Sequence, residues 1–282
     1  MIQNLSNAGE AVQGGFETTV PAYQEFLAYN DTGGKMQTAL AKLEVDKVQE
    51  LTKVGKESRH MLCDNPLPPS VEDAIAHAYS GLDSGAADGL SVAVRSSATA
   101  EDLPDSSFAG HQETFLNVVG LDAVTARIRE VFASLYNDRA IAYRVHQGFD
   151  HDSVFLSAGV QKMVRSDLAS SGVMFSIDTE SGFDQVVFIT SAYGLGETVV
   201  QGAVNPDEFY VYKPHLEKHQ HAILRRNLGD KAVRMVYGEQ HQLQSATHTQ
   251  NVEPELQRQF SISGEEAHNL ASLAVIIEQH YG

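Results

Sequence analysis

Basic residues and cysteine are scarce in this sequence. Its 282 residues include 20 Lys and Arg against 37 Asp and Glu, which gives a formal net charge of −17, and one cysteine. The shortage of positive charge argues against a nucleic-acid surface or an anionic membrane as partner, because both need clustered cations. A local arginine or lysine pocket still suffices for a small polyphosphate. A single cysteine excludes an intrachain disulfide and favours a reducing compartment, so we expect a cytoplasmic protein.

Long apolar runs and an apolar leader are missing as well. No stretch approaches the roughly 20 apolar residues that span a membrane. The first residues, MIQNLSNAGEAV, lack the apolar core of a signal peptide. The sequence therefore predicts no membrane partner. With 42% hydrophobic and 8% aromatic residues, its composition is that of a globular protein large enough for one large domain or two modest lobes.

Helical spacing of apolar residues dominates the first third of the chain. Residues 19–30, 46–62 and 70–82 each read as a helix. Ser70 and Asp73 have the spacing of a capping box at the start of the third. The first third is therefore predicted to be helical.

Two further helices are predicted later in the chain. Residues 121–148 show 4-3-4 apolar spacing, which indicates one amphipathic helix ending at Gly148. Ser263 and Glu266 form a second candidate capping box, and a helix is predicted from there to the end of the chain. The apolar positions of the 121–148 helix are Val124, Ile128, Val131 and Leu135.

The region from about 153 to 237 has a different pattern. Short runs rich in Val, Ile, Phe and Tyr, separated by turns such as TESGFDQ, are typical of antiparallel strands. We predict an α+β fold: two α+β lobes around a ligand cleft, with a central antiparallel sheet region. Its parts are a helical stretch at 1–90, a mixed and β-rich stretch at 91–237, and a connector with a C-terminal helix at 238–282.

A single arginine among hydroxyls is the first candidate site. The apolar run SVAV delivers Arg95, and Ser96, Ser97 and Thr99 follow. A guanidinium can hold two phosphate oxygens through parallel charged hydrogen bonds, and hydroxyls with backbone N–H groups can complete a cradle. Gly110 would let a backbone flap lie close over the ligand. The alternative is a surface loop in which Arg95 pairs with the acidic residues that follow it.

Two glycine motifs do not support a standard nucleotide loop. Gly194 and Gly196 resemble the start of a dinucleotide fingerprint, but Val199 stands where the third glycine is required. The segment GGKM at 33–36 lacks the spacer and the Ser/Thr of a P-loop. The segment after the glycines offers oxygens that either reach a Mg-nucleotide or are solvated loop groups. These residues are Glu197, Gln201, Asn205, Asp207 and Glu208.

The segment VQKMVRSD at 160–167 is a second candidate site. A strand backbone can read an adenine, with the apolar side chains of Met163 and Val164 against the ring. A plain core strand explains the same residues.

Four stretches together closely resemble the phosphoenolpyruvate synthase (pyruvate, water dikinase) family, in its N-terminal ATP-grasp, nucleotide-binding domain. They are VAVRSSATAEDLPDSSFAGHQETFLNV, FASLYNDRAIAYRVHQGFDH, the run from LSAGVQKMVRSD to DEFYVYKP, and AVIIEQHYG. The resemblance covers nearly the whole chain. Pyruvate phosphate dikinase and rifamycin phosphotransferase share the domain and match these segments less well.

The resemblance implies an enzyme that converts ATP, pyruvate and water to phosphoenolpyruvate, AMP and phosphate. It implies Mg²⁺, a phosphohistidine domain and a pyruvate-binding barrel domain, the last two absent from this sequence. It places a phosphate-binding lysine upstream of residue 1 and metal-binding carboxylates downstream of Gly282. We therefore expect no metal ligands in this chain, and a chain that is close to inactive alone. Two alternatives stay open: a dikinase or antibiotic phosphotransferase with another acceptor, and a non-catalytic nucleotide-binding module.

The resemblance also assigns roles to single residues. It implies that Arg95 clamps phosphate as a catalytic residue and that Arg144 is a second catalytic arginine at the phosphates. Gly110 and Thr114 correspond to a flap over the phosphates. The residues that correspond to the adenine-reading hinge are Gln161, Lys162, Met163 and Val164.

Overall fold

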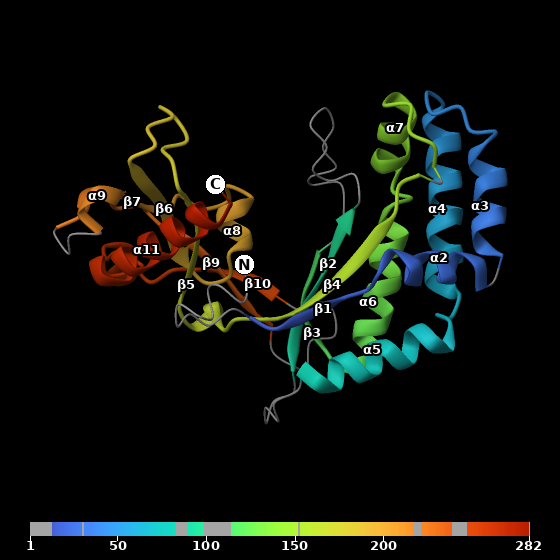
Figure 1. Ribbon diagram of the computed structural model, residues 1–282, viewed down its shortest axis with the longest axis horizontal. Helices are drawn as coiled ribbons and strands as arrows, with labels where there is room; N and C mark the ends of the chain where they lie inside the picture. The colour runs from blue at the N-terminus through green and yellow to red at the C-terminus, as the bar shows by residue number, and fades with distance from the viewer. Residues whose placement is uncertain are drawn as a thin grey trace. The chain divides into compact units, whose positions relative to one another are not determined.

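The computed structural model describes residues 13–29, 31–82, 90–98, 114–151, 153–216, 221–238 and 247–281. The chain divides into two compact units, Gln13–Met163 (the N-terminal unit) and Val164–Gly282 (the C-terminal unit). Each unit combines helices with antiparallel sheet (Figure 1). The predicted α+β class is therefore confirmed.

The N-terminal unit packs helices against a four-stranded antiparallel sheet of order β1-β4-β2-β3 (Figure 1). The sequence patterns did not predict β1, β3 or α3, because each is short and α3 contains two glycines. The elements are β1 (Gly15–Glu17), α2 (Val20–Tyr29), α3 (Thr32–Leu40), α4 (Val48–Asp64), α5 (Pro69–Leu82), β2 (Ser91–Ala98), β3 (Thr114–Val119), α6 (Leu121–Ser134), α7 (Asp138–His146) and β4 (Leu156–Lys162).

One face of this sheet is a wall of the hydrophobic core. Val92 and Val94 of β2 have no exposed surface, and the alternate residues of β4 are buried with them. Aromatic side chains of α2 and α6 fill the same core, where the Tyr23 and Phe132 ring centroids lie 5.0 Å apart. Because successive residues of a strand point to opposite faces, the residues between these buried ones lie on the other face.

Residues 121–148 form two helices, α6 and α7, so the prediction of one continuous helix is wrong. Helix α4 packs on the break between them: the Arg59 guanidinium donates to the Tyr136 carbonyl at 2.7 Å and to the Asp138 carboxylate at 3.2 Å. Gly55 permits this approach, since a Cβ there would lie 2.7 Å from Oδ1 of Asp138. The apolar spacing runs through the break, so contacts with α4 decide where the helix stops.

The C-terminal unit contains a second four-stranded antiparallel sheet, of order β5-β6-β7-β8, and the hairpin β9-β10. Helix α11 covers one face of the sheet with buried alanines, whose small side chains allow close packing. The elements are the 3-10 helix η1 (Ser166–Leu168), β5 (Ser170–Phe175), β6 (Val186–Tyr193), α8 (Glu197–Val200), β7 (Asp207–Tyr212), α9 (Lys213–Leu216), β8 (Ile223–Asn227), β9 (Val233–Tyr237), β10 (Thr247–Asn251), α10 (Pro254–Gln257) and α11 (Gly264–Tyr281).

The strands predicted between 153 and 237 are confirmed as β4 to β9, but they do not form one sheet. Strand β4 pairs with β1 and β2 of the N-terminal unit, and β5 to β8 form the sheet of the other unit. Strand β10 and helix α10 lie in the segment predicted as a polar connector. Polar sequence hid β10, which reads THTQN. Within the described residues, no helix is both long and apolar enough to cross a membrane.

One of the two predicted capping boxes is confirmed. The Ser263 N–H donates to the Glu266 carboxylate at 2.6 Å, and the Glu266 N–H donates to the Ser263 hydroxyl at 3.2 Å. The box at Ser70 is wrong, because α5 already begins at Pro69 and the Ser70 hydroxyl donates to Glu25 of α2 instead.

Candidate functional site

The second face of the N-terminal sheet brings Arg95 and Thr114 together. Arg95 of β2 stands directly opposite Thr114 of β3 and Gly159 of β4, and Glu17 of β1 stands opposite Gly159. One row therefore crosses all four strands, with opposed Cβ positions about 4.5–5.5 Å apart. The predicted phosphate clamp and one predicted flap residue are cross-strand neighbours.

Gly159 leaves room in this row for the long side chains beside it. A Cβ at position 159 would lie 3.5 Å from Cγ of Arg95 and 3.7 Å from Cγ of Glu17. Arg95 is exposed, and no described residue forms an ion pair with it. Sequence reasoning missed Glu17 and Gly159. The alternation in SAGVQK, which puts Gly159 on the same face as Gln161, was the available signal for the glycine.

Gln161 lies on the same face, one row further along β4. It stands opposite Gly15 of β1 and Ala93 of β2, whose small size leaves the amide partly exposed. Diagonal neighbours in a sheet are about 7–8 Å apart, so one extended ligand can contact both Gln161 and Arg95. The face as a whole carries Ser91, Ala93, Arg95 and Ser97 of β2, with Ser157, Gly159 and Gln161 of β4.

The other residues of the predicted adenine-reading hinge, Lys162, Met163 and Val164, lie at the end of β4 and directly after it. Lys162 follows Gln161, so strand alternation puts its side chain on the opposite face. The Met163 N–H donates to the Ser91 carbonyl at 3.0 Å. The Val164 side chain is 53% exposed. The chain passes from one unit to the other between Met163 and Val164.

Arg144 lies inside the helical layer of the N-terminal unit. Its side chain has no exposed surface, its Nε donates to Nδ1 of His151 at 3.1 Å, and its guanidinium lies 5.5 Å from the centre of the Tyr136 ring. Among the residues that the structure describes, its two terminal nitrogens have no hydrogen-bond partner. Desolvation lowers the pKa of the Arg144 guanidinium. In this conformation Arg144 does not reach a ligand on the Arg95 face.

Glu197, Gln201 and Glu208, three of the polar residues at 197–208, are hydrogen-bonded within the C-terminal unit. Glu197 accepts from the Gln201 amide at 2.7 Å, and Glu208 accepts from the Asn227 amide at 2.6 Å. Gly110, the second predicted flap residue, lies outside the described residues.

Asp207 is a structural carboxylate. It has no exposed surface, and its Oδ1 accepts from Lys231 Nζ at 2.6 Å and from the Gly229 N–H at 2.9 Å. Its Oδ2 accepts from the N–H and hydroxyl of Ser261 at 2.6 and 2.8 Å. These contacts decide against Asp207 as a metal ligand. In the described part of the chain no group of three or more His, Cys, Asp or Glu residues is arranged to hold a metal ion.

Gly194 has a packing role. Its φ is +86°, and a Cβ there would lie 2.5 Å from the Met235 carbonyl of β9. The Leu195 N–H donates to the same carbonyl at 2.9 Å. The Gly-Leu-Gly turn therefore anchors β9, in agreement with the exclusion of a dinucleotide fingerprint.

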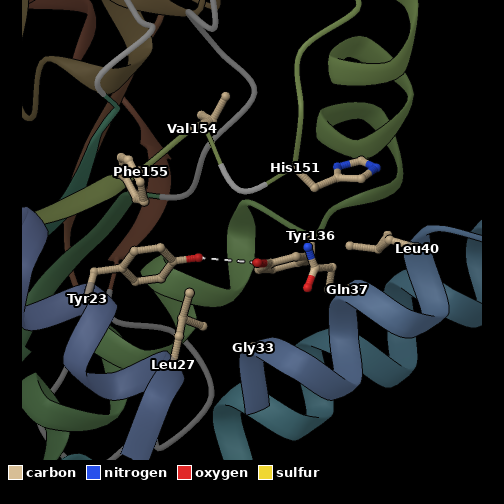
Figure 2. A pocket seen from close by; sticks show the side chains of 9 residues that line it. All are labelled: Tyr23, Leu27, Gly33, Gln37, Leu40, Tyr136, His151, Val154 and Phe155. Carbon is tan, nitrogen blue, oxygen red and sulfur yellow. Dashed lines mark hydrogen bonds between the residues drawn. The ribbon is translucent and has the colours of Figure 1, made fainter. Parts of the chain in front are cut away.

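A small pocket lies in the helical layer of the N-terminal unit (Figure 2). The Tyr23 and Tyr136 hydroxyls point toward one another across it, 3.4 Å apart, and His151 lies at its side. Its volume is about 90 Å³, whereas ligand sites measure about 300–1,000 Å³. None of the predicted site residues lines it, and it is too small for a nucleotide. Its lining residues are Tyr23, Leu27, Gly33, Gln37, Leu40, Tyr136, His151, Val154 and Phe155.

Comparison with known proteins identifies the family. The model of the pyruvate phosphate dikinase AMP/ATP-binding domain matches residues 1–282. Phosphoenolpyruvate synthases of Escherichia coli and Neisseria meningitidis are 57% and 56% identical to this chain over its whole length. That of Pseudomonas aeruginosa is 56% identical. The chain spans 36% of the length of each of these relatives.

The match agrees with the geometry. A domain of this family is ATP-grasp-like, with mixed helix and antiparallel sheet, and both units have that composition. The family model is that of an AMP/ATP-binding domain, and the Arg95 face offers an exposed guanidinium, an exposed hydroxyl and a partly exposed amide. This chain therefore belongs to the family of the pyruvate phosphate dikinase AMP/ATP-binding domain.

Proposed function

We propose that this chain is the ATP-binding domain of a phosphoenolpyruvate synthase, and that the triphosphate of ATP binds on the face that carries Arg95, Thr114 and Gln161. The row from Glu17 to Thr114 across all four strands is the observation that carries the proposal. Arg95 is exposed and has no ion-pair partner among the described residues. Such an arginine is suited to bind an anion, because its guanidinium can donate two parallel hydrogen bonds to two phosphate oxygens.

Arg95, Thr114 and Gln161 each have a role in this proposal. Arg95 holds phosphate oxygens and offsets their charge, and the Thr114 hydroxyl on the neighbouring strand donates to the same group. The Gln161 amide lies one row nearer to the 163–164 segment, where the adenine binds. Positioning and charge neutralisation are most of what a protein supplies to phosphoryl transfer. Gly110 is proposed as the flap.

The remaining chemistry is proposed to lie outside this chain. In the full-length polypeptide, ATP, pyruvate and water become phosphoenolpyruvate, AMP and phosphate through a phosphohistidine on another domain. A barrel domain binds pyruvate. Mg²⁺ bound with ATP would neutralise phosphate charge, and carboxylates elsewhere in the full-length polypeptide would hold it. The cytoplasm is the proposed location.

Binding of Mg-ATP to the 282-residue chain tests the nucleotide site. Mg-ATP should raise the midpoint of thermal unfolding by mass action. R95Q should weaken ATP binding by about 10–100-fold in calorimetry, because a hydrogen bond to a charged group contributes roughly 1.5–3 kcal/mol. R139Q removes the same charge from an exposed position on α7 and should leave the affinity unchanged. Equal affinities of R95Q and R139Q would contradict the proposed site.

An activity assay tests the assignment of the whole enzyme. The full-length polypeptide should form AMP and phosphate from ATP only when pyruvate is present, and R95Q should abolish most of this activity. The 282-residue chain should form no AMP. AMP formation independent of pyruvate would favour a dikinase or phosphotransferase with another acceptor.

A further inference from the structure

The segment that crosses between the units is held on both sides of one peptide bond. On the N-terminal side, the Met163 N–H donates to the Ser91 carbonyl of β2 at 3.0 Å. On the C-terminal side, the Val164 carbonyl accepts the Ser166 N–H at 2.8 Å and the Tyr237 hydroxyl at 3.5 Å. The Met163–Val164 peptide is therefore placed by two anchors, one from each unit.

Tyr237 is also tied to this segment through Arg165. The Arg165 guanidinium lies 5.1 Å from the centre of the Tyr237 ring, a cation–π contact. Two parallel hydrogen bonds, of 2.8 and 2.9 Å, join the same guanidinium to the Asp167 carboxylate. Asp167 is 8% exposed, so the Arg165 guanidinium is hydrogen-bonded to a buried carboxylate. The contact of the Tyr237 hydroxyl with the Val164 carbonyl, at 3.5 Å, is long for a hydrogen bond. The cation–π contact with Arg165 is therefore the main interaction between Tyr237 and this segment.

The strand that carries Tyr237 is itself anchored. Tyr237 ends β9, which pairs with β10, and Leu195 donates to Met235 in the middle of β9 at 2.9 Å. Gly194 allows that contact, because any Cβ would collide with the Met235 carbonyl. The hydroxyl and ring of Tyr237 therefore project from a strand that the Gly-Leu-Gly turn fixes.

The anchors leave one peptide group of the crossing segment available. The Val164 carbonyl is occupied by Ser166 and Tyr237, and the Met163 N–H by Ser91. Within the described residues, the Met163 carbonyl and the Val164 N–H make no hydrogen bond. The hydrogen bonds to Ser91, Ser166 and Tyr237 therefore orient the Met163–Val164 peptide without using its own carbonyl or N–H group.

We infer that Tyr237, acting with the Arg165–Asp167 pair, is a positioning residue that orients the Met163–Val164 peptide for recognition of the nucleotide base. The inference rests on the proposed function and adds to it a residue more than 70 positions away along the chain from the base site. Tyr237 touches the segment and not the ligand, so its loss should change selectivity for the base and leave phosphate binding intact.

Calorimetry with two ligands tests this role. Y237L keeps apolar bulk and removes both the hydroxyl and the ring face. It should weaken Mg-ATP binding about tenfold, because a cation–π contact and a hydrogen bond are lost together, and leave the affinity for Mg-bound inorganic triphosphate unchanged. Y237F should weaken ATP binding by only about twofold, since it keeps the stack on Arg165. D167N should lie between the two.

Y210L is the matched control. Tyr210 of β7 lies under Arg225 at 5.6 Å, so this variant removes a tyrosine–arginine stack from the same unit without touching the crossing segment. It should bind both ligands as the unchanged chain does. Equal loss of ATP and triphosphate binding in Y237L, or no loss of either, would overturn the inference while the proposed function stands. An unchanged chain that binds neither ligand would remove both.

Discussion

Among the residues that the structure describes, each unit buries one long basic side chain completely, and the two have opposite hydrogen-bond environments. Lys231 in the C-terminal unit donates to the Asp207 carboxylate at 2.6 Å and to the Gly229 carbonyl at 2.8 Å. Arg144 in the N-terminal unit has one hydrogen bond, to His151, and none from its terminal nitrogens within the described residues. The attraction and hydrogen bonds within a buried pair offset the cost of removing its charges from water, whereas a buried cation without such partners leaves that cost uncompensated.

The two sheets show a second contrast on the faces that their core helices leave uncovered. In the N-terminal unit the cross-strand row is small and polar around Arg95. In the C-terminal unit the corresponding row is aromatic, with ring centroids 6.5 and 4.8 Å apart. Two four-stranded antiparallel sheets thus carry different chemistry, because the side chains that alternate outward differ. The row consists of three aromatic residues, Phe175, Phe188 and Tyr210, and ends at Arg225, whose guanidinium lies over the Tyr210 ring.

The largest effect is expected from breaking the paired cation. K231M leaves the Asp207 carboxylate buried without its counter-charge, and should lower the free energy of unfolding by about 3–5 kcal/mol. Urea unfolding followed by circular dichroism measures the change. The double variant D207N/K231M should recover part of the loss, since no charge remains buried and the amide oxygen introduced at position 207 can still accept from the Gly229 or Ser261 N–H. A K231M variant as stable as the unchanged chain would show that the Lys231–Asp207 pair does not stabilise this unit.

The helix break in the N-terminal unit should respond next. G55A puts a Cβ 2.7 Å from Oδ1 of Asp138 and 3.1 Å from the Tyr136 carbonyl. We expect a loss of about 1–3 kcal/mol from overpacking, although alanine favours the helix by about 1 kcal/mol. G81A in α5 has open space around the added methyl group and should be neutral or stabilising. Similar urea midpoints for the two variants would refute the role of Gly55.

Removing the unpaired cation should have the opposite sign. R144M replaces a buried, poorly satisfied guanidinium with an apolar side chain of similar length, and should leave stability unchanged or raise it by about 1–2 kcal/mol. Thermal unfolding measures this. Calorimetry with Mg-ATP on the same variant tests the predicted catalytic role. Unchanged ATP affinity would mean that Arg144 acts only inside the helical layer, and reduced affinity that it reaches the phosphates in another conformation.

The smallest effect concerns the capping box of α11. Hydrogen bonds from the Ser263 N–H and hydroxyl lower the pKa of Glu266 below its ordinary 4.5. A lowered pKa in the folded state gives stability that is present above the ordinary pKa and lost as pH falls through the folded pKa. Because this carboxylate is solvent-screened, we expect a contribution of only about 0.3–1 kcal/mol. The free energies of unfolding of E266Q and the unchanged chain should therefore differ at pH 7 and converge as the pH falls through the folded-state pKa of Glu266.

The candidate site was partly predictable from sequence. The run VAVRSS marks a strand that ends in an exposed arginine, and SAGVQK shows by alternation that Gln161 faces one side. Neither run reveals that β2 and β4 are neighbours, so the proximity of Arg95 to Gln161 needed the register. Lys162 stood beside Gln161 in the motif and lies on the opposite face, which alternation alone would have indicated. Tyr237 gave no signal, because its contacts are with residues far away in sequence.

The sequence by itself determined the helices with full apolar periods, the strands rich in branched and aromatic residues, the capping box of α11 and the family. These depend on neighbours within a few residues, whose spacing is visible in one dimension. Only the tertiary structure decided where α6 stops, which sheet β4 joins, and why Asp207 binds Lys231 and not a metal. Those outcomes depend on groups brought together from distant positions, where close packing and the cost of leaving a buried charge unpaired select one arrangement.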